Sequence, residues 1–295
     1  MYGFSPPELA SLCCAFLWAF SGMILRSQSH QVTPAAMNVI RCGVAGSLFW
    51  CIVPFHPAPL SDLALVPWRD WALLVASFTI GIAVGDTLYM ISIKEIGISR
   101  TMALTGVFPL TTIAWEALLL GNPLQTTLLL GSLLVVGGVY FLSLKDQKNA
   151  PQDSAHLRRG ILVALFAAVL WGLSATLLKP ATANMDIVHA NATRMPLIAL
   201  IVYLARVRPS SQETLRGVSL KSFAVVGFSG ALGMGLSAYL FIYAIGEIGV
   251  AKVVTLSSIS PLFGMAMAVV FLKEKVTWQV AVGVGLCLAG VWTVI

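Results

Sequence analysis

Long apolar segments with few charges recur along the whole chain, and they restrict its fold more than any other feature. A helix that crosses a bilayer needs about 20 mostly apolar residues, because the hydrocarbon core is about 30 Å thick and a helix rises about 1.5 Å per residue. The segments do not alternate in polarity as the strands of a membrane β-barrel do. We therefore expect an all-α integral membrane protein with ten transmembrane helices. The predicted spans are 8–26, 34–54, 71–92, 99–120, 125–143, 160–179, 187–205, 222–245, 251–272 and 278–295.

The scarcity of charged residues excludes a soluble globular protein of this size. Only 10% of the 295 residues are charged and 58% are apolar, whereas an average soluble domain is about 25% charged. The net charge of +6 is explained by basic loops on one side of the membrane rather than by nucleic acid binding. The five cysteines lie in apolar segments and form neither a disulfide framework nor a metal-binding pattern. The expected partners are the lipid bilayer and a small-molecule substrate.

Lysine and arginine are distributed unevenly between the two sets of connections. The connections that follow odd-numbered spans carry 13 of them, whereas the opposite side carries 3, namely Arg69, Lys179 and Lys252. Positively charged connections tend to stay in the cytoplasm. The count predicts a cytoplasmic linker at 144–159 and places both termini outside the cytoplasm.

The two halves of the chain resemble each other at an offset of 153 residues, which drifts to 152. The matches, in chain order, are 17–26 with 170–179, Asn38 and Arg41 with Asn191 and Arg194, 95–100 with 247–252, Pro109 with Pro261, and Gly131 and Gly138 with Gly283 and Gly290. Five spans are an odd number, so the second copy begins on the opposite side of the membrane. The sequence thus predicts two inverted five-helix repeats, at 1–143 and 160–295, joined by the linker 144–159.

These features resemble the drug/metabolite transporter superfamily in its EamA-type ten-helix form. The resemblance covers nearly the whole chain, and it rests on paired Trp and Ser residues, the Glu-Ile-Gly turns, the mid-helix prolines and the segment 273–277. The first half departs from it, because Gly121-Asn122-Pro123 stands where the family usually has a Gly-Glu turn. Within the superfamily the chain is most similar to exporters of amino acids, especially aromatic ones. The resemblance implies export from the cell, and it supports a cavity lined by spans one, three, four, six, eight and nine.

Trp18 and Trp171 fall near the centres of spans one and six. An indole at the membrane midplane needs a hydrogen-bond partner or a hydrated cavity, since Trp otherwise prefers the interface. Ser21 and Ser174 follow three residues later on the same helix faces. We expect these four side chains to bind substrate. The alternative is an indole packed in the core and bonded to a neighbouring helix.

Pro109 and Pro261 fall in the middle of spans four and nine, where we expect helix kinks. Each proline frees the carbonyl four residues earlier, which belongs to Thr105 or Ser257. In lipid that carbonyl needs a donor, which is either a substrate group or the neighbouring hydroxyl. Because Ser260 makes this stretch still more polar, we expect Thr105, Ser257 and Ser260 to line the cavity.

Three tyrosines are further candidates for substrate binding. Tyr239 and Tyr243 are four residues apart and therefore share a helix face on span eight, and Tyr89 lies on span three. Their rings can stack on an apolar side chain while their hydroxyl groups orient it. The alternative is that all three pack in the core.

Four charged residues lie inside predicted spans: Arg41, Asp86, Glu116 and Arg194. Intramembrane charges are costly and rarely face lipid. Their depths along the helices predict two ion pairs, Arg41 with Asp86 and Glu116 with Arg194. The alternative is that each side chain reaches to the interface by itself. Asp86 is the best remaining candidate for a proton carrier.

The sequence has no P-loop, HExxH or GxSxG motif, and it predicts no catalytic residue, metal site or cofactor. We expect a secondary transporter or facilitator of the cell inner membrane that works by alternating access. The expected cargo is a small amphipathic metabolite, with amino acids, including aromatic ones, favoured. One alternative is an efflux or uptake carrier for another organic solute, such as a drug, sugar or nucleotide-like compound. The other is a membrane-embedded enzyme or sensor.

Overall fold

The computed structural model describes residues 4–28, 30–143, 154–210, 214–272 and 277–295. All regular elements in this part of the chain are helical, as expected. Nine segments of it are long and apolar enough to cross a membrane, and Trp278–Val294 is a shorter apolar helix. The predicted all-α membrane fold is therefore confirmed.

The first half contains five spans, three of which consist of more than one element. Its elements are α1 (Pro6–Gln28), α2 (Pro34–Ile52), η1 (Val53–Phe55), η2 (Leu60–Leu65), α3 (Trp68–Phe78), η3 (Thr79–Gly85), α4 (Asp86–Ile96), α5 (Ile98–Thr105), α6 (Phe108–Leu120) and α7 (Thr126–Ser143). The third span is α3, η3 and α4 in succession, and the fourth is α5 followed by α6.

The second half repeats this pattern. Its elements are α8 (Ser154–Ala181), α9 (Ile187–Val202), η5 (Tyr203–Val207), α10 (Leu220–Gly230), η6 (Ala231–Leu236), α11 (Ser237–Ile248), α12 (Val250–Ser257), α13 (Ser260–Leu272) and α14 (Trp278–Val294). Helix α8 begins inside the segment predicted as a linker, of which 144–153 lies outside the described residues. Most of the predicted segment 273–277 lies outside them too.

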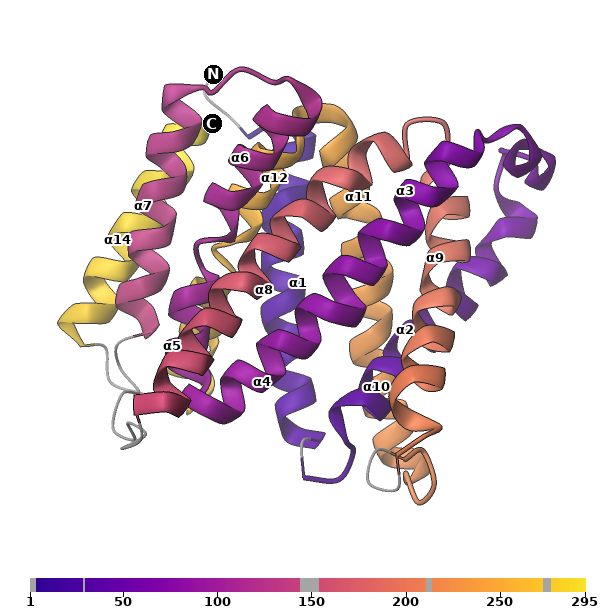
Figure 1. Cartoon of the computed structure of the whole chain (residues 1–295), viewed down its shortest axis with the longest axis horizontal. Helices are drawn as coiled ribbons and strands as arrows, with labels where there is room; N and C mark the ends of the chain where they lie inside the picture. The colour runs from indigo at the N-terminus through magenta and orange to yellow at the C-terminus, as the bar shows by residue number, and fades with distance from the viewer. Residues whose placement is uncertain (1–3, 29, 144–153, 211–213, 273–276) are drawn as a thin grey trace.

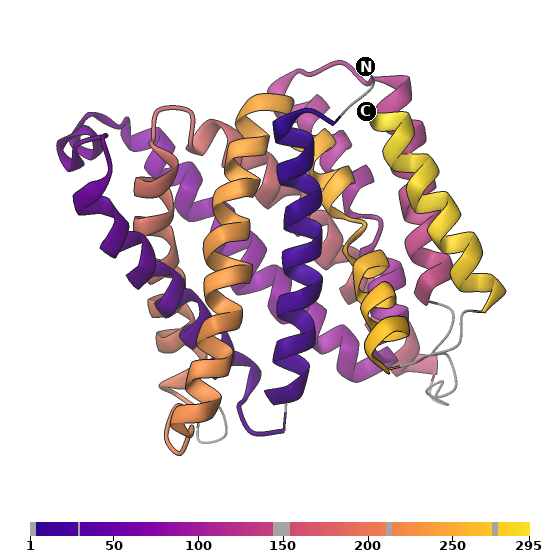
Figure 2. The same cartoon turned by 180° about the vertical axis from the view of Figure 1, so that it is seen from behind.

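The two halves exchange their first helices. Helix α1 packs against α10, η6 and α11 of the second half, while α8 packs against α3, η3 and α4 of the first (Figure 1). The two helices run in opposite directions, α1 downward and α8 upward in Figure 1, and both termini lie at the same end. Seen from behind, α1 and α10–α11 lie side by side (Figure 2). Equivalent helices that run in opposite directions are what an inverted repeat predicts.

Glycines matched between the halves explain the close pairing of α7 with α14. A Cβ atom at Gly138 would lie 2.7 Å from the carbonyl oxygen of Gly283, and one at Gly131 would lie 2.8 Å from that of Gly290. Both distances are too short for any side chain. The glycines let the two backbones approach closely, which is the main source of helix association in lipid.

The repeated Glu-Ile-Gly motif forms the same tight turn in both halves. Gly97 ends α4 with φ of 82° and ψ of 161°, and Gly249 ends α11 with φ of 85° and ψ of 158°. This backbone conformation is essentially restricted to glycine. The motif therefore fixes the reversal from the third span into the fourth in each half.

The helix that carries Arg194 is capped at the membrane boundary by Asp186. The Asp186 carboxylate accepts backbone N–H groups of Val188 at 2.8 Å and His189 at 3.2 Å, and it lies 2.9 Å from Nε2 of His56. Burial acts to raise the pKa of Asp186, but the hydrogen bonds from His56 and from the two backbone groups outweigh it and lower this pKa. These contacts join the start of α9 to the segment that follows α2.

Candidate functional site

A cavity of about 410 Å³ lies between the halves, and it is lined by residues of both. Its wall includes the indoles of Trp18 and Trp171, which come from the exchanged helices α1 and α8. The third and fourth spans of each half supply most of the remaining wall. Most of the lining therefore comes from spans one, three, four, six, eight and nine, which are the spans expected to supply it.

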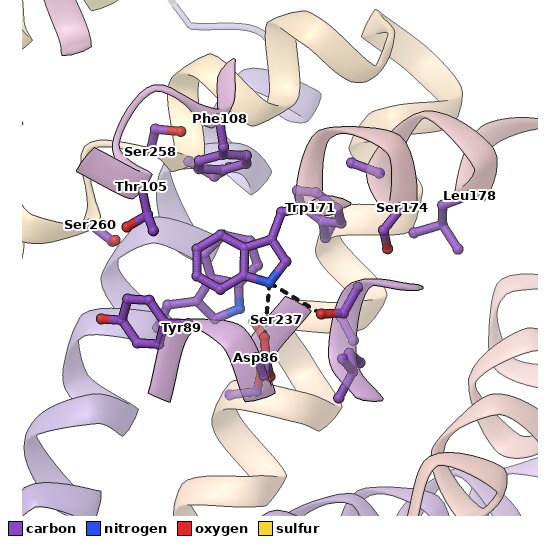
Figure 3. Close-up of a pocket in the computed structure, with 18 of the residues that line it drawn as sticks. Asp86, Tyr89, Thr105, Phe108, Trp171, Ser174, Leu178, Ser237, Ser258 and Ser260 are labelled. Carbon is purple, nitrogen blue, oxygen red and sulfur yellow. Dashed lines mark hydrogen bonds between the residues drawn. The ribbon is translucent and has the colours of Figure 1, made fainter. Parts of the chain in front are cut away.

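Trp171 is held by contacts with the third and fourth spans of the first half (Figure 3). Its Nε1–H donates to Oδ1 of Asp86 at 2.9 Å and to the carbonyl of Gly81 at 3.2 Å. Its ring centroid lies 5.2 Å from that of Tyr89 and 6.2 Å from that of Phe108. Hydrogen bonds and ring contacts together thus fix the indole at the cavity wall.

Trp18 has an equivalent position in the other half. Its ring centroid lies 5.3 Å from that of Phe241, and both rings line the cavity. Phe241 corresponds to Tyr89 at the offset of 152. Two related aromatic pairs therefore face one cavity, and each pair joins one half to the other.

Ser174 lines the cavity, but Ser21 does not. Ser21 is only 1% exposed, and its hydroxyl group is 2.7 Å from that of Ser229. A Cβ atom at Gly233 would lie 2.4 Å from Oγ of Ser21. The predicted binding role of Ser21 is therefore replaced by a packing role, because its side chain is enclosed between α1 and the third span of the second half.

The fourth span of each half is broken, rather than merely kinked, in front of its proline. Helix α5 ends at Thr105 and α6 begins at Phe108, and α12 ends at Ser257 and α13 begins at Ser260. Thr105, Ser257 and Ser260 line the cavity as expected, together with Pro261. Pro109 is buried and does not line it.

The hydrogen bonds formed by the described residues around the breaks leave the carbonyls of Thr105 and Ser257 without a donor. The hydroxyl of Thr105 donates to the carbonyl of Thr101 at 2.9 Å, and that of Ser257 donates to the carbonyl of Val254 at 3.2 Å. Within the described ranges, none of the backbone bonds that bridge the breaks ends on the carbonyl oxygen of Thr105 or Ser257. The neighbouring hydroxyl groups therefore do not satisfy these carbonyls, contrary to one of the two alternatives.

Of the three predicted tyrosines, only Tyr89 lines the cavity. Tyr239 is 37% exposed on the outer surface of the bundle, and Tyr243 packs against the core. The aromatic residue of α11 in the cavity wall is instead Phe241, which the sequence analysis missed. The repeat itself contained the signal, because Phe241 is the counterpart of Tyr89.

The ion pair predicted between Glu116 and Arg194 is not formed. Oε1 of Glu116 accepts the backbone N–H of Val250 at 3.3 Å, and Oε2 accepts that of Ala251 at 3.0 Å. The Asn122 amide donates to Oε1 at 3.0 Å. Glu116 therefore caps the first turn of α12, and it does not line the cavity.

The predicted pair of Arg41 and Asp86 is not formed either. Among the described residues, no ion pair within 4 Å joins these side chains. Asp86 lines the cavity, bonded to Trp171, whereas Arg41 lies outside the wall. Arg194 does line the cavity, and its Nε has no hydrogen-bond partner in the described structure.

In the part of the chain that the structure describes, no group of three or more His, Cys, Asp or Glu residues is arranged to hold a metal ion. The cavity combines apolar and aromatic walls with hydroxyl groups and two opposite charges. Such a lining suits binding of a small amphipathic molecule.

Comparison with known proteins gives consistent matches over the whole length. The sequence profile of the EamA-like transporter family matches residues 6–144 and 158–295 separately. An uncharacterized transporter from Archaeoglobus fulgidus is 26% identical over 279 residues, covering 94% of this chain and 93% of the relative. The uncharacterized transporter YoaV from Bacillus subtilis is 19% identical over 289 residues, covering 96% and 94%.

A solved structure described only as "Crystal structure of protein" has the same fold. It superposes with a TM-score of 0.80 at 16% sequence identity and covers 99% of both chains. Each of the two profile matches covers one half of the chain.

Proposed function

Since the chain belongs to the EamA-like transporter family, and is a multi-pass membrane transporter rather than an enzyme, we propose that it carries amino acids by alternating access. The two units, at 1–143 and 160–295, move against each other around the cavity. Inverted repeats have two packings of similar energy, related by exchange of the conformations of the two halves. One packing opens the cavity to one face of the membrane, and the other opens it to the opposite face.

The observation that carries the amino-acid proposal is the pair of helix breaks in the cavity wall. The carbonyl ends of α5 and α12 carry partial negative charge, and the amino ends of α6 and α13 carry partial positive charge. Residues of both breaks, Thr105 and Ser257 among them, line the cavity. In transporters with broken helices, the amino ends of half-helices face anionic substrate groups, and the freed carbonyls and carboxyl ends coordinate cations. An amino acid carries one group of each charge.

The aromatic pairs support an apolar or aromatic side chain on the solute. Trp171 with Tyr89 and Trp18 with Phe241 supply large rigid surfaces on both sides of the cavity. Its volume of about 410 Å³ is within the range for small-molecule sites. A zwitterion with an apolar side chain matches both features. A phosphorylated solute such as a nucleotide matches the wall less well, because Arg194 is the one basic residue that lines it in the described part of the chain.

The unequal loop charges support a cytoplasmic location for the connection at 144–159 and for the other connections at that end. Both termini then lie on the outer face of the inner membrane, and the direction of transport under cellular gradients is export. These assignments rest on the loop charges and on the resemblance to amino-acid exporters.

Counterflow in proteoliposomes tests the proposed function. Vesicles that contain the purified chain are loaded with unlabelled tryptophan and exposed to a trace of labelled tryptophan outside. We expect a transient accumulation of label that unlabelled phenylalanine reduces and sucrose does not. If no amino acid exchanges while a drug, sugar or nucleotide does, the substrate assignment fails.

A further inference from the structure

Asp86 is the one carboxylate that lines the cavity among the residues that the structure describes. Asp86 is the first residue of α4, directly after the π-helical segment η3, which ends at Gly85. Segments of π-helix are uncommon and occur frequently at functional sites. The carboxylate therefore lies in the wall at a place where the backbone departs from regular helix.

One oxygen of Asp86 is held and the other has no partner. Oδ1 accepts the indole N–H of Trp171 at 2.9 Å, whereas no hydrogen bond to Oδ2 is formed by any residue of the described ranges. No lysine, arginine or histidine of those ranges lies within ion-pair distance. An ionised carboxylate away from bulk water is stabilised only when it is paired. The free oxygen thus lacks the cation that its charge requires.

The charged and titratable groups around Asp86 come from its own helix, α4, and from three other elements. Arg41 and Cys42 on α2 interact with it electrostatically without touching it. Tyr89 lies about one helical turn further along α4, and Arg194 on α9 shares the cavity wall. Arg206 in η5 donates to the hydroxyl of Thr87, the residue next to Asp86, at 3.1 Å. None of these groups is bonded to Oδ2.

The second half has no counterpart of this carboxylate. At the offset of 152, Asp86 corresponds to Ala238, which also lines the cavity. Trp18 therefore occupies the position related to Trp171 without a carboxylate acceptor at this site. Since the repeat folds with alanine in one copy, the acidic group is not required by the packing of the bundle. The carboxylate is therefore present in only one of the two related walls of the cavity.

We propose that Asp86 binds the protonated amine of the transported solute, through Oδ2, and so restricts transport to amine-bearing compounds. This inference rests on the proposed function and adds the residue that selects the substrate class. The rings of Tyr89 and Trp171 lie beside the carboxylate, and their faces attract an ammonium group as well. Arg194 lines the same cavity with the opposite charge, so a zwitterion meets a cation as well as an anion there.

Three indole compounds separate the contributions of the two charged groups of the solute. Tryptophan carries an amine and a carboxylate, tryptamine only the amine, and indole-3-propionate only the carboxylate. Binding to the purified full-length protein is measured by competition against labelled tryptophan. We expect the wild-type protein to bind tryptophan and tryptamine and to discriminate against indole-3-propionate.

The decisive variant is Asp86→Asn, because the asparagine carbonyl still accepts the Trp171 indole N–H while the charge is removed. We expect affinity for tryptophan and tryptamine to fall about 10- to 100-fold, as expected for loss of a charged hydrogen bond, with little change for indole-3-propionate. Glu247→Gln removes an exposed carboxylate at the end of α11 and serves as the matched control. Thermal unfolding of both variants shows whether the fold is retained.

The outcomes distinguish this inference from the proposed function. Counterflow of amino acids that is equal in wild type and Asp86→Asn would overturn the role of Asp86 and leave amino-acid transport standing. Absence of amino-acid exchange in the wild type would overturn the proposed function itself. If Asp86→Asn abolishes only the response of exchange to a pH gradient and keeps the preference for amines, the cation at Asp86 is a proton, which also contradicts the proposal.

Discussion

Exchange of tryptophan is expected to fall about 100-fold when Trp171 is replaced by alanine, while the protein still folds. The substitution removes an indole that contacts Tyr89 and Phe108 and donates to Asp86. The solute loses an aromatic surface, which contributes about 0.5–1.5 kcal/mol. It also loses part of the about 1.5–3 kcal/mol of a hydrogen bond to a charged group, because the Asp86 carboxylate is no longer held in place by the indole. Together these losses correspond to one or more orders of magnitude in transport efficiency. Counterflow at several substrate concentrations measures the effect.

Two further variants separate the parts of this contribution. Trp171→Phe keeps an aromatic ring against Tyr89 but lacks the N–H donor, so it is expected to retain more exchange than Trp171→Ala. Trp278→Ala removes an indole that is 65% exposed at the start of α14, where an interfacial position is expected, and should leave exchange unchanged. Normal exchange by Trp171→Ala would show that the indole only fills space.

The largest expected loss of stability comes from Glu116→Ala. The Glu116 side chain is 6% exposed and accepts the backbone N–H groups of Val250 and Ala251 and the side-chain amide of Asn122. Each buried donor left without an acceptor costs about 1–3 kcal/mol, so we expect a loss of roughly 3–5 kcal/mol. The bonds also join α6 of the first half to α12 of the second, so a contact between the halves is lost at this end.

Thermal unfolding in detergent measures this loss. Glu116→Gln retains one acceptor oxygen and is expected to unfold between the wild type and Glu116→Ala. Glu247→Ala, at an exposed glutamate, is the control for loss of a carboxylate. An unfolding temperature of Glu116→Ala equal to that of the wild type would contradict the capping role.

The spans and the duplication could be predicted from the sequence because both depend on local properties. Apolar length determines which segments cross the bilayer, and the repeat offset identifies equivalent positions without knowledge of packing. This is why the positions of Trp18 and Trp171 in the cavity wall could be anticipated. The same offset would have identified Phe241 from Tyr89.

Side-chain directions were harder to predict, because they depend on how each helix is rotated. The spacing of Tyr239 and Tyr243 shows that they share a face of α11, but it does not show whether that face is turned to the cavity. The cavity wall is formed instead by Phe241, which is two residues from each of them. Ser21 and Ser174 share one motif and still differ, because only Ser21 is fully enclosed by its neighbours.

The partners of the buried charges were missed for a different reason. Counting depth along the spans compares one charged side chain with another. It does not include the free N–H groups at a helix start, which are also partners for a carboxylate. Glu116 takes this second kind of partner at α12, and Asp86 takes an indole N–H.

In the proposed transport cycle, one cavity between the two halves is reached from each face of the membrane in turn. To test this access, Ser260 in the cavity wall is replaced by cysteine in a protein whose five native cysteines have been replaced. Membrane-impermeant thiol reagents are then applied to either side of oriented vesicles. We expect modification from both faces, with tryptophan in the bath slowing both reactions. Modification from one face only, whether or not tryptophan is present, would contradict this cycle.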